Sequence, residues 1–559
     1  MSGSSSPASV RPPRLSLGPL AEAVDRRLGG WTDGDAPTRI WEKDPTFWPA
    51  APAADVASRL GWMSLPTGDA RLIADLTKFA DEVRGDGVTD VAVLGMGGSS
   101  LAPQVYAATF GTRAGYPRLH VLDSTHPLAV PTLAGSLDLR RTLFVVSSKS
   151  GTTLEPNAFL AYFWEEVART GVNPGHQFVA VTDPDTALDR LATARGFRWI
   201  CRAPPDVGGR YSALTVFGLL PAALIGVDLP ALLDRARAMA AGCGPDVAAE
   251  GHPALVLAAA VGEAALAGAD KLVFVTSSSL ASFPSWGEQL VAESTGKIGK
   301  GIVPVADEVD PFDPMGRRDR LIVSLTVRGE SNPTLERGLA SLTAAGAPMI
   351  EIELGDRLDL GAEFFRWEMA IAAAGAVVGI DPFDQPDVEL AKDLARAALK
   401  APPSPSGAAP DAAVRADDPG GLADAVSKWM SSAPPGGYAA IQAYLPPGMA
   451  MTEALQRLRG KIRRHLGSTT TLGYGPRFLH STGQLHKGGP PTGAFLQLVD
   501  DSLPIVPVPG MDVTFGRIIR AQAAGDATAL RQRGRPLLTV DLGSGGVDAV
   551  DRVGEAVHG

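Results

Sequence analysis

The sequence predicts an α/β protein made of two similar three-layer αβα sandwiches with mainly parallel sheets, followed by a C-terminal α/β elaboration. Short, continuously apolar segments alternate with helical stretches along the chain, a pattern typical of parallel strands buried on both faces. The same alternation starts again after about residue 250. With 559 residues, 45% of them hydrophobic and 20% charged, the chain is globular and long enough for about three to four domains.

The first sandwich is expected over residues 15–240, after a Ser- and Pro-rich tail at 1–14 that we expect to be disordered. Its strands are expected where an apolar segment precedes Gly, Ser, Asp or Thr and then a helix, namely at 91–94, 119–122, 143–147 and 178–181. An uncharged apolar stretch at 213–227 is shorter than the roughly 20 residues that a bilayer requires, so it predicts a buried helix.

The second sandwich is expected over residues 241–400, and a Pro- and Ser-rich segment at 401–421 predicts an exposed linker. The second sandwich contains an Ala-rich helix at 253–266 and strands at 272–276, 322–327 and 349–354. Residues 422–559 contain apolar segments at 438–445 and 495–499, a basic helix at 454–466 and a last strand at 536–542. They predict a third, smaller α/β unit or an elaboration packed on the second sandwich.

Charge and cysteine content exclude several classes of protein. Lys and Arg number 51 against 61 Asp and Glu, and this net charge of −10 favours neither a nucleic acid nor an anionic membrane as partner. Two cysteines, Cys201 and Cys243, exclude a disulfide framework and a Cys-rich metal site and favour a reducing compartment. The N-terminus has no basic region followed by an apolar one, so no secretory signal is expected. We therefore expect a soluble, cytoplasmic protein.

Two loops at the carboxyl ends of predicted strands are candidates for anion binding. Residues 95–100 contain Gly95, Gly97, Gly98 and Ser99 before a helix, where backbone N–H groups can approach an anion. Ser100 occupies the position of the third glycine of the dinucleotide fingerprint, so that function is not indicated. A tight strand-to-helix turn is the alternative interpretation.

The second loop, residues 147–153, has five hydroxyl side chains, one lysine and one glycine before a helix that extends to about residue 170. Hydroxyls and free N–H groups at a helix start suit a phosphate dianion, with Lys149 as a point charge. Helix capping is the alternative, but a single Ser or Thr would provide it. The loop has no Gly-x4-Gly-Lys-Ser/Thr pattern, which argues against a nucleoside triphosphate.

Single residues elsewhere allow both a catalytic and a structural interpretation. Arg210 follows two glycines and can hold an oxyanion, or can be an exposed arginine in a turn. Glu293 lies in the last turn of a helix expected over 284–295, where the helix dipole disfavours a carboxylate, so it is either solvated or retained as a base. Glu389 and Lys392 can form a surface i,i+3 pair.

Two of the eight histidines, His480 and His486, lie in a segment rich in glycine and hydroxyl residues. No HExxH or CxxC pattern accompanies them, so no metal site is expected. A histidine in such surroundings favours proton transfer or hydrogen bonding.

Taken together, these segments resemble the phosphoglucose isomerase family. Residues 95–103 are similar to its Gly-Ile-Gly-Gly-Ser substrate loop, and residues 148–155 to its Ser-Lys-Thr-x-Thr-Thr-x-Glu phosphate loop. The other similar segments, in the same order as in the family, are 208–212, 293–297 with Gln289 four residues before Glu293, and 383–392. The resemblance implies two sugar-isomerase (SIS) domains and aldose–ketose isomerisation of glucose 6-phosphate, without metal or organic cofactor, in a homodimer.

The resemblance also implies roles for particular residues. Glu293 moves the proton between C1 and C2, Arg210 stabilises the developing oxyanion, and Lys392 opens the ring together with a histidine. The residues implied in substrate or phosphate binding are Gly98, Ser99, Ser148, Lys149, Ser150, Thr153, Gln289 and Gln385.

The sequence departs from the common family pattern at two places. Asp387 replaces the glycine of the second family signature, and no Asn-Gly-Gln-His segment lies between Glu293 and Lys392. Residues 480–489 resemble instead the form in which the isomerase is fused behind a transaldolase, and they make His480 the preferred histidine over His486. The stretch before the first sandwich is too short for a transaldolase domain, so that activity is not expected.

Two other functions stay open at this point. A non-catalytic phosphosugar-binding regulator would keep the loop at 148–153 but would not need Glu293, Arg210 and Lys392. An isomerase for another hexose phosphate, such as mannose 6-phosphate, would differ only in pocket geometry. The role of residues 422–559 also stays open.

Overall fold

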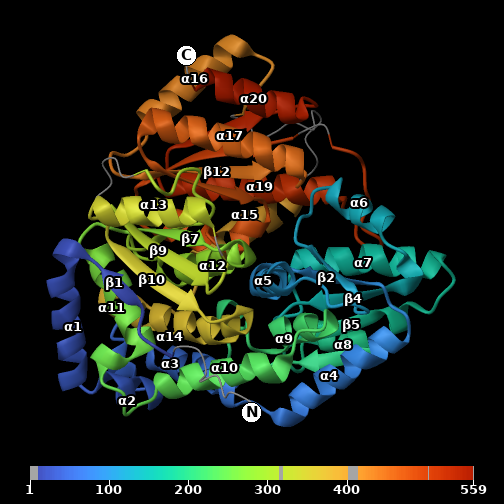
Figure 1. Ribbon diagram of the computed structural model, residues 1–559. Coiled ribbons are helices and arrows are strands. Elements are labelled where there is room, and N and C mark those ends of the chain that lie inside the picture. The colour runs from blue at the N-terminus through green and yellow to red at the C-terminus, as the bar shows by residue number, and fades with distance from the viewer. Residues whose placement is uncertain (1–9, 314–318, 331, 401–412, 501–502, 558–559) are drawn as a thin grey trace.

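The computed structural model describes residues 10–313, 319–330, 332–400, 413–500 and 503–557, and within these ranges the strands form three five-stranded sheets (Figure 1). The strand β2 (Asp90–Gly95) shows why they are layered. Its Val91 and Val93 belong to one hydrophobic cluster and its Ala92 and Leu94 to another, so both faces of the sheet are covered. The predicted α/β class is confirmed. No helix among the described residues is apolar over a sufficient length to span a membrane.

The first sheet has the order β3-β2-β4-β5-β6 and is parallel throughout. Its remaining strands are β3 (Arg118–Leu122), β4 (Thr142–Ser147), β5 (Phe178–Thr182) and β6 (Trp199–Arg202). The helices of this unit are α4 (Ala70–Gly85), α5 (Leu101–Phe110), α6 (Ala129–Ser136), α7 (Leu154–Arg169), α8 (Ala187–Ala194), α9 (Val216–Leu224) and α10 (Leu229–Gly242). The apolar stretch at 213–227 forms the fully buried helix α9, as predicted.

The second sheet has the order β1-β10-β9-β7-β8. Its parallel strands are β7 (Lys271–Thr276), β8 (Val303–Val305), β9 (Arg320–Val327) and β10 (Met349–Leu354), and β1 (Arg14–Ser16) pairs antiparallel with β10. The helices of this unit are α1 (Ala21–Asp33), α2 (Ala36–Trp41), α3 (Ala53–Arg59), α11 (Pro253–Leu266), α12 (Phe283–Thr295), α13 (Pro333–Ala344), α14 (Leu360–Val378) and α15 (Pro386–Lys400).

The start of the chain differs from the expected arrangement, in which residues from 15 onward belong to the first sandwich. The strand β1 extends the second sheet, and α1 packs against α11 of the second unit. Residues 1–9 of the expected tail lie outside the described residues.

The third sheet is as large as the other two and has the order β11-β15-β14-β12-β13, parallel throughout. Its strands are β11 (Val414–Arg415), β12 (Tyr438–Tyr444), β13 (Thr469–Tyr474), β14 (Gly493–Val499) and β15 (Leu537–Asp541). Its helices are α16 (Pro419–Ser431), α17 (Met449–Leu466), α18 (Gly483–Gly488), α19 (Phe515–Gln532) and α20 (Gly546–Ala556). The strand β11 and the start of α16 lie in the range expected as a linker, and residues 401–412 of that range lie outside the described residues.

All three sheets share one strand order. Four successive strands lie as second, first, third, fourth: β3-β2-β4-β5, β8-β7-β9-β10 and β13-β12-β14-β15. In such a sheet the first and third strands meet at a topological switch point, where the following loops leave a crevice at their carboxyl ends. In the first sheet these strands are β2 and β4, which pair up to Gly95 and Ser147, so the loops at 95–100 and 147–153 start side by side at this edge.

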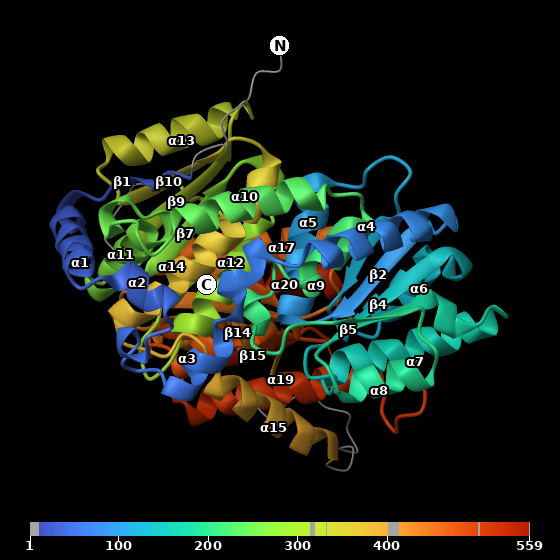
Figure 2. The same ribbon diagram turned by 90° about the horizontal axis from the view of Figure 1, so that it is seen from below.

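The third unit, coloured orange to red, covers one side of the other two units (Figure 1), and α19 packs along α15 (Figure 2). Its strand β12 shares a hydrophobic cluster with the second sheet, in which Tyr438 and Ala440 join Val273 and Val275. This shared apolar core stabilises the third unit on the second.

Asp387 explains one departure from the family pattern. It lies in the first turn of α15 and is 6% exposed, and its carboxylate accepts from Nε2 of Gln484 at 2.8 Å and from Nη2 of Arg533. The backbone N–H of Asp387 donates to Oε1 of Gln484 at 2.8 Å. A glycine could not make the side-chain contacts, so this aspartate anchors the third unit to α15.

We expect Asp387→Ala to lower the free energy of unfolding by about 1–3 kcal/mol, since it removes hydrogen bonds from a buried carboxylate to the third unit. Urea denaturation would measure the change. Asp393→Ala is the matched control, because Asp393 lies on the same helix with its side chain 67% exposed. Equal destabilisation by both substitutions would contradict the anchoring role.

Candidate active site

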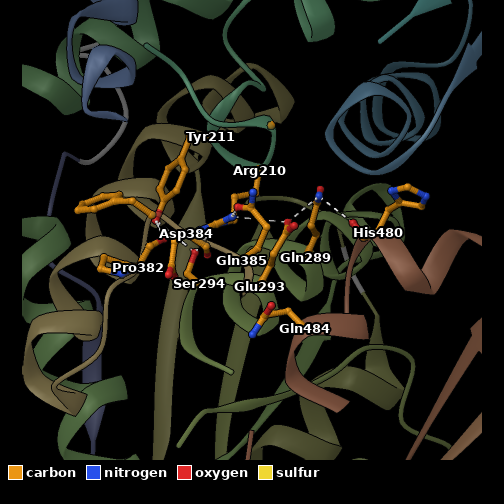
Figure 3. A network of polar contacts seen from close by, with 12 residues as sticks. Arg210, Tyr211, Gln289, Glu293, Ser294, Pro382, Asp384, Gln385, His480 and Gln484 are labelled. Atoms are coloured by element: carbon orange, nitrogen blue, oxygen red, sulfur yellow. Dashed lines mark hydrogen bonds and ion pairs between the residues drawn. The ribbon is translucent and has the colours of Figure 1, made fainter. Parts of the chain in front are cut away.

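The candidate site lies where loops of all three units meet. Figure 3 shows Arg210 and Glu293 side by side, with Gln289 between Glu293 and the turn that carries His480. Arg210 comes from a 3-10 turn (Gly209–Tyr211) of the first unit, Glu293 from the end of α12 in the second, and His480 from a 3-10 turn (Arg477–His480) that follows β13 in the third. Residues far apart in the sequence thus converge on one site.

Glu293 is held by two neighbours. Its Oε2 accepts from Nε2 of Gln289 at 3.0 Å and lies 3.8 Å from Nη1 of Arg210. Glu293 is 8% exposed, so it is not the solvated carboxylate of the alternative interpretation. Gln289 also donates to the backbone oxygen of His480 at 2.9 Å, which connects the helix α12 to the third unit.

The guanidinium of Arg210 is buried, with 3% of the residue exposed, which excludes an exposed arginine in a turn. Its Nε donates to Oγ of Ser294 at 2.8 Å and its Nη1 to Oε1 of Gln385 at 2.9 Å. Its Nη2 donates to the backbone oxygens of Pro382 at 2.6 Å and Asp384 at 3.0 Å. This planar group is therefore fixed in orientation beside Glu293.

Lys297 holds the loop that positions Gln385, a role that the sequence analysis did not assign. Its ammonium donates to the backbone oxygen of Asp384 at 2.6 Å and to Oδ1 of Asp384 at 2.7 Å. Burial lowers the pKa of Lys297 to about 8, and the nearby charge of Arg210 acts in the same direction. The signal available in the sequence was the Gly-Lys pair directly after α12.

His480 pairs with Glu155, a residue that the sequence analysis included only as part of the phosphate-loop motif. Nε2 of His480 lies 3.1 Å from Oε1 of Glu155, which is 5% exposed in the first turn of α7. Burial alone would raise the pKa of Glu155, but the charge and hydrogen bond of His480, a backbone hydrogen bond and the charge of Lys392 outweigh it and lower the pKa below its ordinary value. Glu155 is thus a carboxylate.

His486 lies elsewhere. It is buried in the third unit against the rings of Tyr438, Phe478 and Phe495, and its Nδ1 is 3.3 Å from Nε2 of Gln442. Burial lowers the pKa of His486 well below its ordinary value, and the charges of nearby basic residues act in the same direction. The structure therefore brings His480, and not His486, to the candidate site.

The glycine loop packs directly against the catalytic candidates. A Cβ on Gly97 would lie 2.9 Å from both Nε2 of Gln289 and the backbone oxygen of His480, and a Cβ on Gly98 would lie 2.0 Å from the backbone oxygen of Gly209. Ser99 ends this turn and is 8% exposed. These glycines are needed for close approach of three backbone segments, in addition to any contact with an anion.

The hydroxyl-rich loop leads into α7. Thr153 occupies the N-cap position of α7, yet its side chain makes no capping hydrogen bond, so capping does not explain it. Oγ of Ser148 donates to Oγ1 of Thr153 at 3.2 Å, and Oγ of Ser150 lies 3.0 Å from Oγ1 of Thr152. The hydroxyls thus gather around the N-terminus of a helix, where N–H groups favour an anion.

The two predicted lysines already have acidic partners. Nζ of Lys149 donates to Oδ2 of Asp183 at 2.5 Å and to the backbone oxygen of Pro205 at 3.1 Å. This ammonium therefore binds the segments that follow β5 and β6. Nζ of Lys392 donates to Oε1 of Glu389 at 2.8 Å, which is the expected i,i+3 pair, and its side chain is 40% exposed. Lys392 nevertheless lies near enough to the His480–Glu155 pair to influence the pKa of Glu155.

No group of three or more His, Cys, Asp or Glu side chains in the described part of the chain is arranged to hold a metal ion. The chemistry that the site offers is that of a buried carboxylate beside a fixed guanidinium, next to a histidine–carboxylate pair and a hydroxyl-lined helix N-terminus.

Comparisons with known proteins identify the family to which this chain is similar. Residues 77–305 match the family model of phosphoglucose isomerase. The glucose-6-phosphate isomerase of Rubrobacter xylanophilus is 32% identical over 394 residues, which cover 61% of this chain and 89% of that protein. The glucose-6-phosphate isomerase of Synechococcus elongatus is 30% identical over 440 residues, covering 69% of this chain and 78% of that protein.

Two solved structures are also similar. A hypothetical protein from Thermus thermophilus is 28% identical with a TM-score of 0.61, covering 70% of this chain and 100% of that one. A glucose-6-phosphate isomerase from Chlamydia trachomatis shares the fold with a TM-score of 0.55 at 20% identity, covering 66% of this chain and 84% of that one.

Proposed function

This chain belongs to the phosphoglucose isomerase family and interconverts glucose 6-phosphate and fructose 6-phosphate, and we propose that it does so through ring opening and an enediolate formed beside Glu293. The observation that carries the mechanism is an unbroken series of contacts. It leads from Glu155, two residues after Thr153, to His480, then to Gln289 and on to Glu293. This series of contacts supports a single site bordered by the phosphate loop and the base.

Phosphate binding falls to the hydroxyl-rich loop. Ser150 and Thr153 donate hydrogen bonds to the phosphate, together with backbone N–H groups at the start of α7. Ser148 joins them when its single hydroxyl proton turns from Thr153 to the phosphate. The ammonium of Lys149 adds positive charge near this loop while it remains bound to Asp183. Gly98 and Ser99 border the substrate from the facing loop.

Proton transfer between C1 and C2 falls to Glu293. Its carboxylate takes the C2 proton and returns that proton to C1, while the hydrogen bond from Gln289 orients the carboxylate. Arg210, fixed by Gln385 and Ser294, stabilises the negative charge that develops on the enediolate oxygen.

Ring opening falls to His480 and Lys392. A carboxylate only accepts hydrogen bonds, so Nε2 of His480 must donate to Glu155, which leaves Nδ1 to exchange a proton with the sugar. Lys392 supplies a second proton-bearing group near the same pair.

We expect Thr153→Val to raise KM for the sugar phosphate by about 10–100-fold with little change in kcat, since it removes one hydrogen bond to a dianion. Steady-state kinetics and inhibition by inorganic phosphate would measure the change. Thr193→Val is the control, because the Thr193 hydroxyl donates to the backbone oxygen of Asp189 within α8. A KM unchanged by Thr153→Val would contradict phosphate binding by this loop.

A coupled assay of the purified protein on glucose 6-phosphate, fructose 6-phosphate and mannose 6-phosphate tests the function itself. Turnover of glucose 6-phosphate is expected. Phosphosugar binding without turnover would instead support the regulator, and faster turnover of mannose 6-phosphate would support the other isomerase.

We propose a homodimeric assembly and a cytoplasmic location for this chain. The resemblance implies a homodimer, in which a histidine can be donated across the interface, and a cytoplasmic enzyme of glycolysis and gluconeogenesis. In this structure the histidine at the site comes from the third unit of the same chain. Analytical ultracentrifugation, with activity measured over a range of protein concentrations, tests whether dimerisation is required.

A further inference from the structure

We propose that Gln522, on α19 of the third unit, is a positioning residue for ring opening that keeps Glu155 ionised and correctly placed for His480. Gln522 is 4% exposed, and its Nε2 donates to Oε1 of Glu155 at 2.6 Å. The same carboxylate oxygen accepts from Nε2 of His480 at 3.1 Å. One oxygen atom of Glu155 thus binds both the histidine and the glutamine, which reach it from the third unit.

The orientation of the Gln522 amide follows from chemistry. The Glu155 carboxylate can only accept, so Gln522 must present its NH2 group to it and its carbonyl oxygen to the other side. On that side Oγ1 of Thr125, which is fully buried, donates to Oε1 of Gln522 at 2.8 Å. Thr125 follows β3 in the first unit, so the amide is locked between two residues of the first unit.

A neutral donor suits this position. Glu155 is buried, and an ionised carboxylate in such a place needs hydrogen-bond donors to offset its lost hydration. An amide supplies a hydrogen bond without adding a net charge beside the histidine. Gln522 therefore stabilises the carboxylate while leaving room for Nε2 of His480 on the same oxygen.

Removing the amide tests this role, which rests on the proposed isomerase function. We expect Gln522→Leu to lower kcat about 10-fold or more with KM changed less than about 3-fold, because the lost bond acts on Glu155 and not on the phosphate. The acidic limb of the kcat profile should move to higher pH by about one unit, since without this donor the pKa of Glu155 rises and the carboxylate is lost earlier as pH falls.

Gln522→Glu almost preserves the shape of the side chain. It is expected to lose activity as pH rises, whereas Gln522→Leu is expected to lose activity as pH falls. At low pH the substituted side chain is a carboxylic acid that can still donate to Glu155, so activity is expected to persist. As pH rises the shared proton is lost, two carboxylates face each other, and activity should fall where the original protein remains active.

Gln497→Leu is the matched control. Gln497 is a fully buried glutamine of the same unit whose Nε2 donates to the backbone oxygen of Ala523 at 3.1 Å and whose Oε1 accepts from Oγ1 of Thr539 at 3.3 Å. Its substitution should lower stability while leaving the pH profile unchanged. The readouts are kcat and KM against pH and the rate of α/β anomer exchange of the sugar phosphate, which needs ring opening but no C1–C2 proton transfer.

The outcomes separate the two claims. No isomerisation by the original protein would overturn the proposed function. If the original protein is active, a Gln522→Leu profile equal to that of Gln497→Leu would overturn the role of Gln522. Should Gln522→Leu fail to fold, a Gln522→Glu variant whose activity does not fall with rising pH would overturn it equally.

Discussion

Glu293→Gln is expected to lower kcat for isomerisation by about 10²–10⁴-fold, the contribution of a positioned general base. Glutamine keeps the shape of the side chain and the contact with Gln289 but cannot take a proton from carbon. KM should change little, because the phosphate loop is untouched. Anomer exchange should persist, since ring opening depends on His480. Steady-state kinetics combined with exchange of the C2 hydrogen with solvent would measure the effect.

Glu288 is the matched control for this prediction, because its acidity alone would make it a rival base. It lies on the same helix, and burial raises its pKa to about 7, a value suited to proton transfer. Its carboxylate faces Ser481 and the charges of Arg477 and Asp307, whereas Glu293 faces Arg210. We expect Glu288→Gln to retain most of the activity. Retained activity in Glu293→Gln together with its loss in Glu288→Gln would overturn the assignment.

His480→Asn is expected to lower both isomerisation and anomer exchange by about 10²-fold or more, because it removes the group that exchanges a proton with the ring. The two rates should fall together, which distinguishes a ring-opening defect from a loss of the base Glu293. Measuring both rates at several pH values would show whether the loss is confined to the ring-opening step.

His486→Asn is the control, because His486 lies in the same segment but in the core of the third unit. Its substitution should lower stability through lost packing against Phe495 and Tyr438 and should leave kcat nearly unchanged in the folded protein. A larger loss of kcat from His486→Asn than from His480→Asn would show that the wrong histidine has been assigned.

Much of the fold follows from local pattern. The apolar segments predicted at 143–147 and 178–181 became the strands β4 and β5, and the stretch at 213–227 became the buried helix α9. The third unit is larger than expected, because two of its five strands are not among those predicted. The strand β11 is short and lies in a segment that also resembles a linker, and β13 begins with three threonines and is not a continuous apolar segment. The pairing of β1 with the second sheet was not predictable, because its partner β10 lies more than 300 residues later.

The candidate site likewise contains residues that the sequence indicates and residues that only the structure reveals. The hydroxyl-rich loop, Arg210 and Glu293 stood out because their residue types and glycine neighbours suit an anion or a base. The importance of Glu155 and Gln522 did not stand out, because a glutamate in a first helical turn and a glutamine within a helix are ordinary. The bond between Lys149 and Asp183 was equally hidden, since it joins the loops after β4 and β5.

By itself the sequence determined which segments are buried strands, which loops carry hydroxyls and glycines, and that an acid, an arginine and a histidine are available for sugar-phosphate chemistry. Those properties depend on side chains within a few residues of one another. Only the tertiary structure decided that His480 meets Glu155, 325 residues away, and that Gln522 joins them. Such contacts exist because three separately formed sheets pack with their loops together, and that packing is set by apolar surfaces and anchors such as Asp387, which no local pattern reveals.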